Sequence, residues 1–278
     1  MGRSRTPHPP ASAWRLEGAV RSHVGRVRKE NQDAFGFFPD IGLFMVADGL
    51  GGHEGGRQAS ALAVDVVRDN VAATDDEDLT PISDRAGLVS LGARRLLAAV
   101  VEANDRVRDA GHELARRGMG TTVAALLFDR LYGVVAVCHV GDSRVFRLRG
   151  GQLSQLTEDH TVVQQWVREG RIQPEEVAAS PHRHMITQAV GTQESVRPDV
   201  RLERPMDGDV YVLTSDGVHD QISPDEMTAA LNECRGDLEM ACLRLIDLAN
   251  ARGGRDNSTV LLVRCAASAT DDDTTVAS

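Results

Sequence analysis

Aspartate residues stand at the ends of several apolar segments, at points where a strand would end. Asp48 and Asp216 each follow an apolar run and precede a Gly, and Asp142 ends the apolar segment 137–142. Asp256 lies in a Gly-rich turn before another apolar run, and Asp33 closes the polar segment 28–33. Because core strands end at the rim of a sheet, carboxylates at these positions can face one shared cleft.

Carboxylates that converge in this way repel each other. Two unit charges about 4 Å apart cost about 4 kcal/mol at an effective dielectric near 20. Such a cluster therefore needs divalent cations, and an all-oxygen ligand set favours Mg²⁺, Mn²⁺ or Ca²⁺ over Zn²⁺. Two such ions about 3.5–4 Å apart activate a bridging water and stabilise phosphoryl oxygens during an in-line displacement. A single Asp-Gly pair is commonly a turn, so the prediction depends on all five positions together.

The composition narrows the class of protein. The chain has 278 residues, of which 41% are hydrophobic and 4% aromatic, so aliphatic side chains must fill its core. The net charge of -10 argues against nucleic acid as a partner. No apolar run approaches the length of a membrane span, and the four cysteines form no CxxC pair. We therefore expect a cytoplasmic protein with reduced thiols and no membrane span.

The order of the apolar segments predicts an α+β fold. We expect strands over residues 41–47, 122–128, 132–140, 144–148, 210–214 and 259–264, with a hairpin turn at Gly150 and Gly151. We expect helices over residues 58–71, 84–117 (with a break), 224–234 (capped by Ser223) and 237–252. Strands that follow one another without strict βαβ alternation favour layers with antiparallel sheets.

Cys138 offers an alternative chemistry. Together with Arg144 it fits the C-x₅-R spacing of cysteine-dependent tyrosine phosphatases. That chemistry needs a thiolate in a phosphate-binding loop ahead of a helix N-terminus. Here the segment 145–148 continues as a strand, and Asp142 would place a carboxylate inside the phosphate cradle. We therefore expect Cys138 not to be the nucleophile.

Eight motifs carry a resemblance to a known family. In order they are GRVRKENQD (25–33), VADGLGGH (46–53), GTT (120–122), VGDSR (140–144), LTEDH (156–160), ITQAVG (186–191), LTSDG (213–217) and GRDNSTV (254–260). In their order and spacing the chain resembles the metal-dependent Ser/Thr protein phosphatases of the type 2C class, in their bacterial form. The resemblance implies a four-layer α-β-β-α sandwich of two antiparallel sheets flanked by helices. It places a binuclear metal site at one end of the sandwich, holding Mn²⁺ or Mg²⁺.

The resemblance also implies a role for each site residue. Asp48 would bridge both metals, and the carbonyl of Gly49 would bind one of them. Asp216 and Asp256 would complete the shell of the second metal, and Asp33 would hold metal-bound waters. Asp142 would form a weaker third site with Asp216. Thr121 and Asn257 would support these ligands from behind, and Arg28 would clamp the substrate phosphate, a task that suits a bidentate guanidinium.

The implied reaction is direct hydrolysis of phosphoserine or phosphothreonine by a metal-bridging water or hydroxide, without a phosphoenzyme. Expelling an alkoxide calls for a proton donor, for which His53 is the candidate, although a His beside Gly-Gly can also simply cap a turn. His139 and His160 are expected to be structural. Gln32 stands where many relatives have Glu, which predicts a weaker outer contact. His219 is an unusual polar residue that could touch the site.

The composition predicts a flexible lead (residues 1–14) and an acidic flexible tail (269–278), with one catalytic domain between them (15–268). Within the domain, the resemblance implies that residues 161–185 form a flap, which we expect to govern the choice of protein substrate. The expected partners are phosphorylated proteins, namely a Ser/Thr kinase of eukaryotic type or its substrates, and we expect a monomer. The alternative is a pseudophosphatase that only binds phosphoproteins. That alternative predicts lost metal ligands, and the sequence retains every one.

Overall fold

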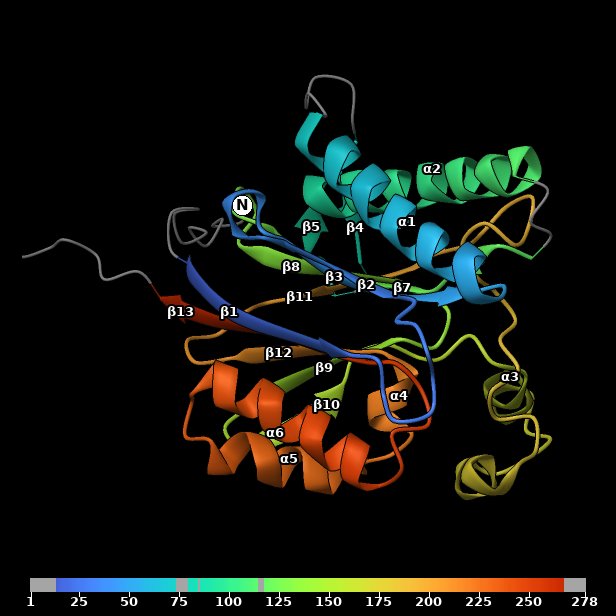
Figure 1. Ribbon diagram of the computed structural model, residues 1–278. Coiled ribbons are helices and arrows are strands. Elements are labelled where there is room, and N and C mark those ends of the chain that lie inside the picture. Colours follow the sequence, from blue (N-terminus) through green and yellow to red (C-terminus); the bar gives the residue numbers. More distant parts are fainter. Residues whose placement is uncertain (1–13, 74–79, 85, 115–117, 268–278) are drawn as a thin grey trace, which may run out of the picture.

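The computed structural model describes residues 14–73, 80–84, 86–114 and 118–267, apart from the side chain of His53 (Figure 1). The expected acidic tail lies outside these ranges, as does the expected lead except for Trp14, which begins the first strand. Within the described part of the chain, no helix combines the length and apolar character that crossing a membrane requires.

Two antiparallel sheets form the centre of the molecule. One has the order β1 (Trp14–His23), β13 (Ser258–Ala267), β12 (Val210–Thr214), β9 (Arg144–Arg149) and β10 (Gln152–Gln155). The other has the order β11 (Asp199–Glu203), β8 (Val134–Val140), β7 (Val123–Asp129), β3 (Leu43–Leu50) and β2 (Asp33–Phe38), and β6 (Gly120–Thr121) also pairs with β3. A small separate ribbon consists of β4 (Ile82–Ser83) and β5 (Val89–Ser90).

Helices cover the outer face of each sheet (Figure 1). The β3-containing sheet packs against α1 (His53–Ala73) and α2 (Leu91–Glu113), and the β13-containing sheet packs against α5 (Pro224–Glu233) and α6 (Leu238–Ala251). The remaining helical elements are η1 (Pro39–Ile41), α3 (Val162–Arg168), η2 (Pro174–Ala179) and α4 (Asp216–His219). This confirms the predicted four-layer α-β-β-α sandwich.

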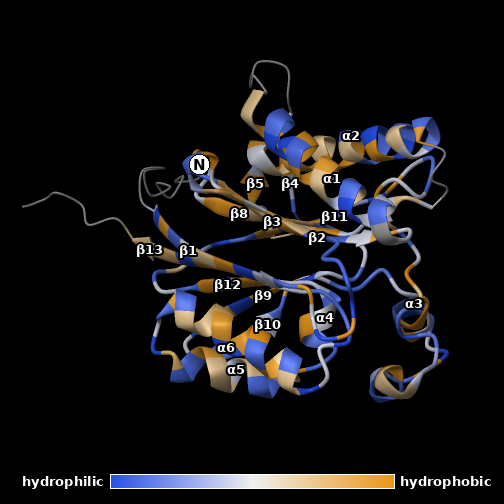
Figure 2. Ribbon diagram, in the orientation of Figure 1, coloured by the Kyte–Doolittle hydropathy of each residue, from blue (hydrophilic) through white to orange (hydrophobic). Residues whose placement is uncertain are grey.

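The alternation of side chains along β3 explains the layers. Phe44 and Val46 point into the core between the two sheets, whereas Leu43 and Met45 point into the core beneath α1 and α2. A strand buried on both faces reads as a continuous apolar run. Figure 2 accordingly shows the central strands as mainly hydrophobic, with hydrophilic residues gathered on the outer helices and loops.

The helix predicted over residues 84–117 starts too early, and the predicted break within it is wrong. Asp84 instead follows β4 and begins a turn, where its carboxylate accepts a hydrogen bond from the backbone amide of Leu88 (2.8 Å). Gly87 has a φ of 78°, which a helix does not allow. Ser90 then caps α2 by accepting from Ala93, and the helix continues unbroken to Glu113. The other predicted helices, and the hairpin turn between β9 and β10, are confirmed within a few residues.

Candidate metal centre

The five predicted aspartates lie where strands of the two sheets end or begin, at one end of the sandwich. Asp48, near the end of β3, pairs directly with Asp33 at the start of β2. Asp216 begins α4 and is separated from the end of β12 by one residue, and Asp256 is separated from the start of the neighbouring strand β13 by one residue. Asp142 lies in the short turn between β8 and β9. Each sheet therefore contributes carboxylates to the same region.

The electrostatics show that these carboxylates interact. Burial, followed by repulsion from Asp33, Asp216 and Asp142, raises the pKa of Asp48 well above its usual value. Burial, followed by Asp142 and other neighbouring carboxylates, does the same to the pKa of Asp216. Burial also raises the pKa values of Asp33 and Asp142 to about 6. The cluster therefore cannot hold all its charges in the metal-free state without a large cost.

Two carboxylate oxygens in the cluster have no hydrogen-bond donor. They are Asp33 Oδ1 and Asp216 Oδ1, and neither is accessible to solvent. The other oxygen of Asp33 is fully engaged, accepting from Ser215 Oγ (2.8 Å) and Thr259 Oγ1 (2.6 Å). Buried carboxylate oxygens need either a donor or a cation. The residues therefore fit hard divalent cations, which the family resemblance implies.

The backbone around Asp48 is held by hydrogen bonds from two threonines. Thr121 Oγ1 donates to the carbonyl of Asp48 (2.9 Å), and Thr122 Oγ1 accepts from its amide (3.0 Å). Thr122 Oγ1 also forms a hydrogen bond with Ser143 Oγ (2.7 Å), next to Asp142. These two threonines thus connect β3 to the loop that carries another carboxylate.

Gly49 and Asn257 also lie where close packing is needed. A Cβ atom on Gly49 would lie 2.2 Å from the carbonyl oxygen of Gly56, so no side chain fits there. Asn257 Oδ1 accepts from the backbone of Gln32 (2.8 Å), and its Nδ2 donates to the carbonyls of Val24 and Glu30 (each 2.9 Å). Asn257 thereby ties the segment before Asp33 to the turn that carries Asp256.

Arg28 lies at the rim of the cluster. Its guanidinium donates to Asp256 Oδ2 (2.6 Å), and 55% of its side chain remains exposed. The hydrogen bond to Asp256 and its charge raise the pKa of Arg28. The backbone of His53 begins α1, but its side chain lies outside the described part of the structure, so its proposed role stays a prediction.

The structure argues against the alternative nucleophile. Cys138 is fully buried within β8 and packs in the core beneath α1 and α2. Burial raises the pKa of its thiol to about 12, which removes the thiolate that such chemistry needs. His219 has a structural contact instead of a catalytic one. Its Nδ1 forms a hydrogen bond with Thr214 Oγ1 (2.8 Å), and burial lowers the pKa of His219 well below the usual value.

Sequence reasoning missed one carboxylate of the cluster, Asp220. Burial raises its pKa, and its ligand oxygen lies within 4.8 Å of the corresponding atoms of Asp216 and His184. His184 belongs to the segment predicted as a flap, and its Nδ1 lies 3.1 Å from Asp220 Oδ2. The i, i+4 spacing of Asp216 and Asp220 was the available signal, because it places both on one face of a helical turn.

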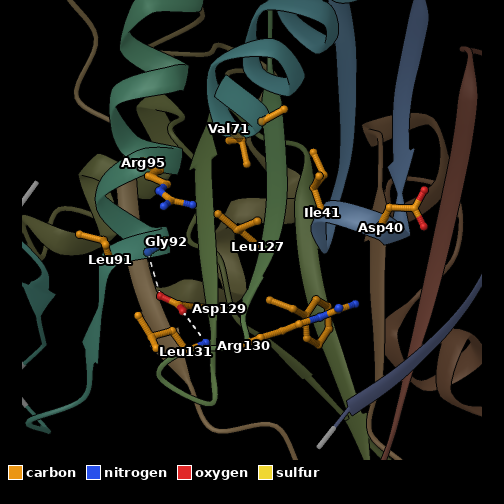
Figure 3. A pocket seen from close by; sticks show the side chains of 12 residues that line it. Asp40, Ile41, Val71, Leu91, Gly92, Arg95, Leu127, Asp129, Arg130 and Leu131 are labelled. Atoms are coloured by element: carbon orange, nitrogen blue, oxygen red, sulfur yellow. Dashed lines mark hydrogen bonds between the residues drawn. The ribbon is translucent and has the colours of Figure 1, made fainter. Parts of the chain in front are cut away.

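A different hollow lies at the far end of the β3-containing sheet (Figure 3). It has a volume of about 320 Å³ and is lined by the end of α1, the start of α2 and the β7–β8 turn. Its buried carboxylate, Asp129, already accepts hydrogen bonds from Gly92 N (2.8 Å) and Ser90 Oγ (2.7 Å). This carboxylate therefore holds the start of α2 in place. Unlike Asp33 Oδ1 and Asp216 Oδ1, its Oδ2 has hydrogen-bond donors, and it stands apart from the carboxylates of the metal centre.

Comparisons with known proteins agree with one another. The sequence model of the Protein phosphatase 2C family matches residues 21–237. The serine/threonine protein phosphatase PstP of Mycobacterium tuberculosis is 37% identical over 249 residues, which cover 89% of this chain and 44% of PstP. Protein phosphatase PhpP of Streptococcus pneumoniae is 32% identical over 254 residues, which cover 89% of this chain and 97% of PhpP.

Solved structures give the same result. The crystal structure of the PstP catalytic domain in complex with two manganese ions superposes with a TM-score of 0.76 at 33% identity, covering 92% of this chain and 100% of that one. The serine/threonine phosphatase of Streptococcus agalactiae superposes with a TM-score of 0.78 at 32% identity, covering 90% and 99%.

Proposed function

The chain belongs to the protein phosphatase 2C family, and on this basis we propose that it removes phosphate from phosphoserine and phosphothreonine side chains of proteins in a metal-dependent reaction. One observation carries the proposal. Partly buried aspartates from both sheets converge at one end of the sandwich, and two of their oxygens are sealed from solvent without a donor. Keeping buried carboxylates ionised in such an arrangement costs free energy, unless cations bind them.

We propose the ligand roles that the family resemblance implies. Asp48, central to the cluster, would contact two Mn²⁺ or Mg²⁺ ions, with the Gly49 carbonyl on one of them. Asp216 and Asp256 would hold the second ion, and Asp33 would orient bound water through its free Oδ1. Asp142 would contribute with Asp216 to a weaker third site. When bound, two such ions lower the pKa of a water molecule and neutralise charge on phosphoryl oxygens.

Arg28 would bind and orient the phosphate. Its exposed guanidinium lies at the edge of the carboxylate cluster, where it can exchange Asp256 for a phosphate oxygen pair. Behind the ligands, Thr121 and Asn257 hold the backbone of β3 and of the turn before β13 in place. His53, at the start of α1, is proposed to give the leaving oxygen its proton. The buried thiol of Cys138 is unavailable as a nucleophile, and we propose that water attacks the phosphorus directly, without a phosphoenzyme.

The segment 161–185 is proposed to select protein substrates. It folds as α3 and η2 and reaches the metal centre through His184. Arg183 of this segment is exposed, and its positive charge would favour a phosphorylated surface, although the chain as a whole is acidic. We propose a Ser/Thr kinase of eukaryotic type, or its targets, as the substrates, and a cytoplasmic monomer as the active form.

The purified protein would be assayed on p-nitrophenyl phosphate and on a phosphothreonine peptide, with MnCl₂ and with EDTA. Asp216→Asn is the test variant, and Asp247→Asn, at an exposed position of α6, is its control. Manganese-dependent activity that is lost only in Asp216→Asn is expected. Activity that survives EDTA would refute the metal-dependent mechanism. Binding of phosphopeptide without turnover under any metal would point to a phosphoprotein-binding role instead.

A further inference from the structure

His160 forms hydrogen bonds with the two peptide groups that flank Gly141. The amide of Gly141 donates to His160 Nδ1 (3.2 Å), and its carbonyl accepts from the backbone amide of His160 (2.9 Å). Gly141 has a φ of 100°, and a Cβ atom there would lie 2.6 Å from Thr122 Cγ2, so only glycine fits. The next residue is Asp142. The direction of its carboxylate therefore depends on two successive peptide groups, one held by the ring of His160 and the next by its backbone amide.

The hydrogen bonds determine the protonation state of His160. A backbone amide can only donate, so Nδ1 carries no proton and the neutral ring carries it on Nε2. Nε2 lies 3.4 Å from Asp199 Oδ2, and the hydrogen bond from His160 lowers the pKa of that carboxyl group. Asp199 therefore selects the tautomer that leaves Nδ1 free to accept from Gly141.

The ring of His139 packs against the ring of His160. The rings of His139 and His160 lie 4.6 Å apart between centroids, and both side chains are buried. His139 Nε2 donates to the carbonyl of Glu158 (2.8 Å), and burial lowers the pKa of His139, so it too remains neutral. The backbone carbonyl of His160 also accepts from Thr187 (2.7 Å), just beyond the segment 161–185. His160 thus lies at the base of that segment and beside Asp142 at once.

The side chains of His139, His160 and Asp199 lie close enough to suggest a metal site of their own, since their ligand atoms fall within 4.8 Å of one another. The hydrogen bonds exclude this. A metal on His160 Nε2 would force the proton onto Nδ1, where it would face the N–H of Gly141. The cluster instead has the arrangement of a carboxylate that orients an imidazole.

We propose that His160, oriented by Asp199, is a positioning residue for Asp142: its Nδ1 holds the amide of Gly141, one residue before Asp142, and thereby helps to aim the Asp142 carboxylate at the cation site. This inference rests on the metal-binding role proposed above for Asp142. It predicts that manganese affinity depends on a hydrogen-bond acceptor at the position of Nδ1, and not on the size or the burial of the ring.

Two substitutions test the roles of the two ring nitrogens separately. In His160→Asn the side-chain oxygen takes the place of Nδ1 and can still accept from Gly141. In His160→Gln the amide reaches the place of Nε2, so contact with Asp199 can persist while the Gly141 amide loses its acceptor. Asp142→Asn provides the reference for a direct loss at the site. Asp199→Ala leaves the ring intact and tests the orienting carboxylate separately.

Manganese binding would be measured by isothermal titration calorimetry, and release of the Gly141 amide by hydrogen–deuterium exchange. In His160→Gln the weakest manganese site is expected to lose about ten- to hundredfold in affinity, as in Asp142→Asn, and the Gly141 amide to exchange faster. His160→Asn should stay close to the wild type in both measurements. Asp199→Ala should weaken the same site in the same direction.

The outcomes distinguish this inference from the proposed function. If Asp142→Asn weakens manganese binding while both His160 variants bind normally, or if both His160 variants weaken it equally, the positioning role is overturned and the role of Asp142 stands. If Asp142→Asn binds manganese like the wild type, the role of Asp142 is wrong, and the inference falls with it. Thermal unfolding of each variant in EDTA would separate a general folding defect from a loss at the site.

Discussion

Replacing Asp33 with Asn should stabilise the metal-free protein, although it damages the metal centre. Asp33 Oδ2 accepts from Ser215 and Thr259, and Asp33 Oδ1 has no donor. An Asn side chain can keep its carbonyl oxygen toward the two hydroxyl groups. Its amide group would then point toward Asp48, replacing repulsion between two carboxylates by a hydrogen bond.

The magnitude follows from the pKa of Asp33, which burial raises from 3.8 to about 6. Because the folded-state pKa is raised, ionisation of Asp33 opposes folding, and this cost is absent at pH values below the unfolded-state pKa. The cost grows as the pH rises from about 4 to about 6 and is complete above that range. About two pKa units correspond to about 3 kcal/mol. The neutral Asn avoids this cost at every pH.

Urea unfolding in EDTA would measure the difference at about pH 7.5 and at about pH 5. Asp33→Asn should be more stable than the wild type by about 2–3 kcal/mol at the higher pH, and this advantage should shrink at the lower pH. Asp247→Asn, at an exposed position of α6, provides the control for a change of net charge. A variant that is less stable than the wild type at both pH values, or an advantage that grows on acidification, would refute this reasoning.

Three further predictions concern individual contacts. Arg28→Lys should lower kcat/KM on p-nitrophenyl phosphate about ten- to hundredfold, since an ammonium group cannot bind phosphate in two places; unchanged kinetics would remove Arg28 from the site. Thr122→Val should lower the free energy of unfolding by about 1–3 kcal/mol in urea, because it deprives Asp48 N and Ser143 Oγ of a buried partner; an unaltered midpoint would contradict this. Cys138→Ala should keep its manganese-dependent activity, and a variant that folds but is inactive would revive the cysteine mechanism.

The strands that the sequence predicted and those it did not differ in their place in the sheets. Every predicted strand has a neighbour on both sides, as β3 and β12 do. Seven strands were not predicted. Four of them, β1, β2, β10 and β11, are the edges of the two main sheets, and the other three, β4, β5 and β6, are only two residues long. Edge strands bury less of each side chain, so their apolar signal is weaker. In β1, for example, only Ala19 is fully buried among ten residues.

The same contrast applies to the site. Asp48 and Asp216 were predictable, because each has an apolar run before it and a glycine after it, and Asp142 ends an apolar run of its own. Asp220 lacks such a context, and only its spacing from Asp216 in a short helix brings it to the cluster. The contact between His160 and Gly141 joins residues 19 positions apart through a backbone amide. Hydrogen bonds of this kind leave no pattern in the residue types, so only coordinates reveal them.

Stability and metal binding oppose each other in this centre, and that opposition provides a way to sort its residues. Carboxylates whose pKa values are raised by burial and mutual repulsion destabilise the metal-free fold, so their replacement by amides should stabilise the protein in EDTA and abolish its gain from manganese. Residues that hold the ligands from behind, such as Thr122, contribute to the fold whether or not cations are bound, so their replacement should destabilise both states. The sign of the change in EDTA therefore separates groups that bind the cations from groups that position them, before any substrate is tested.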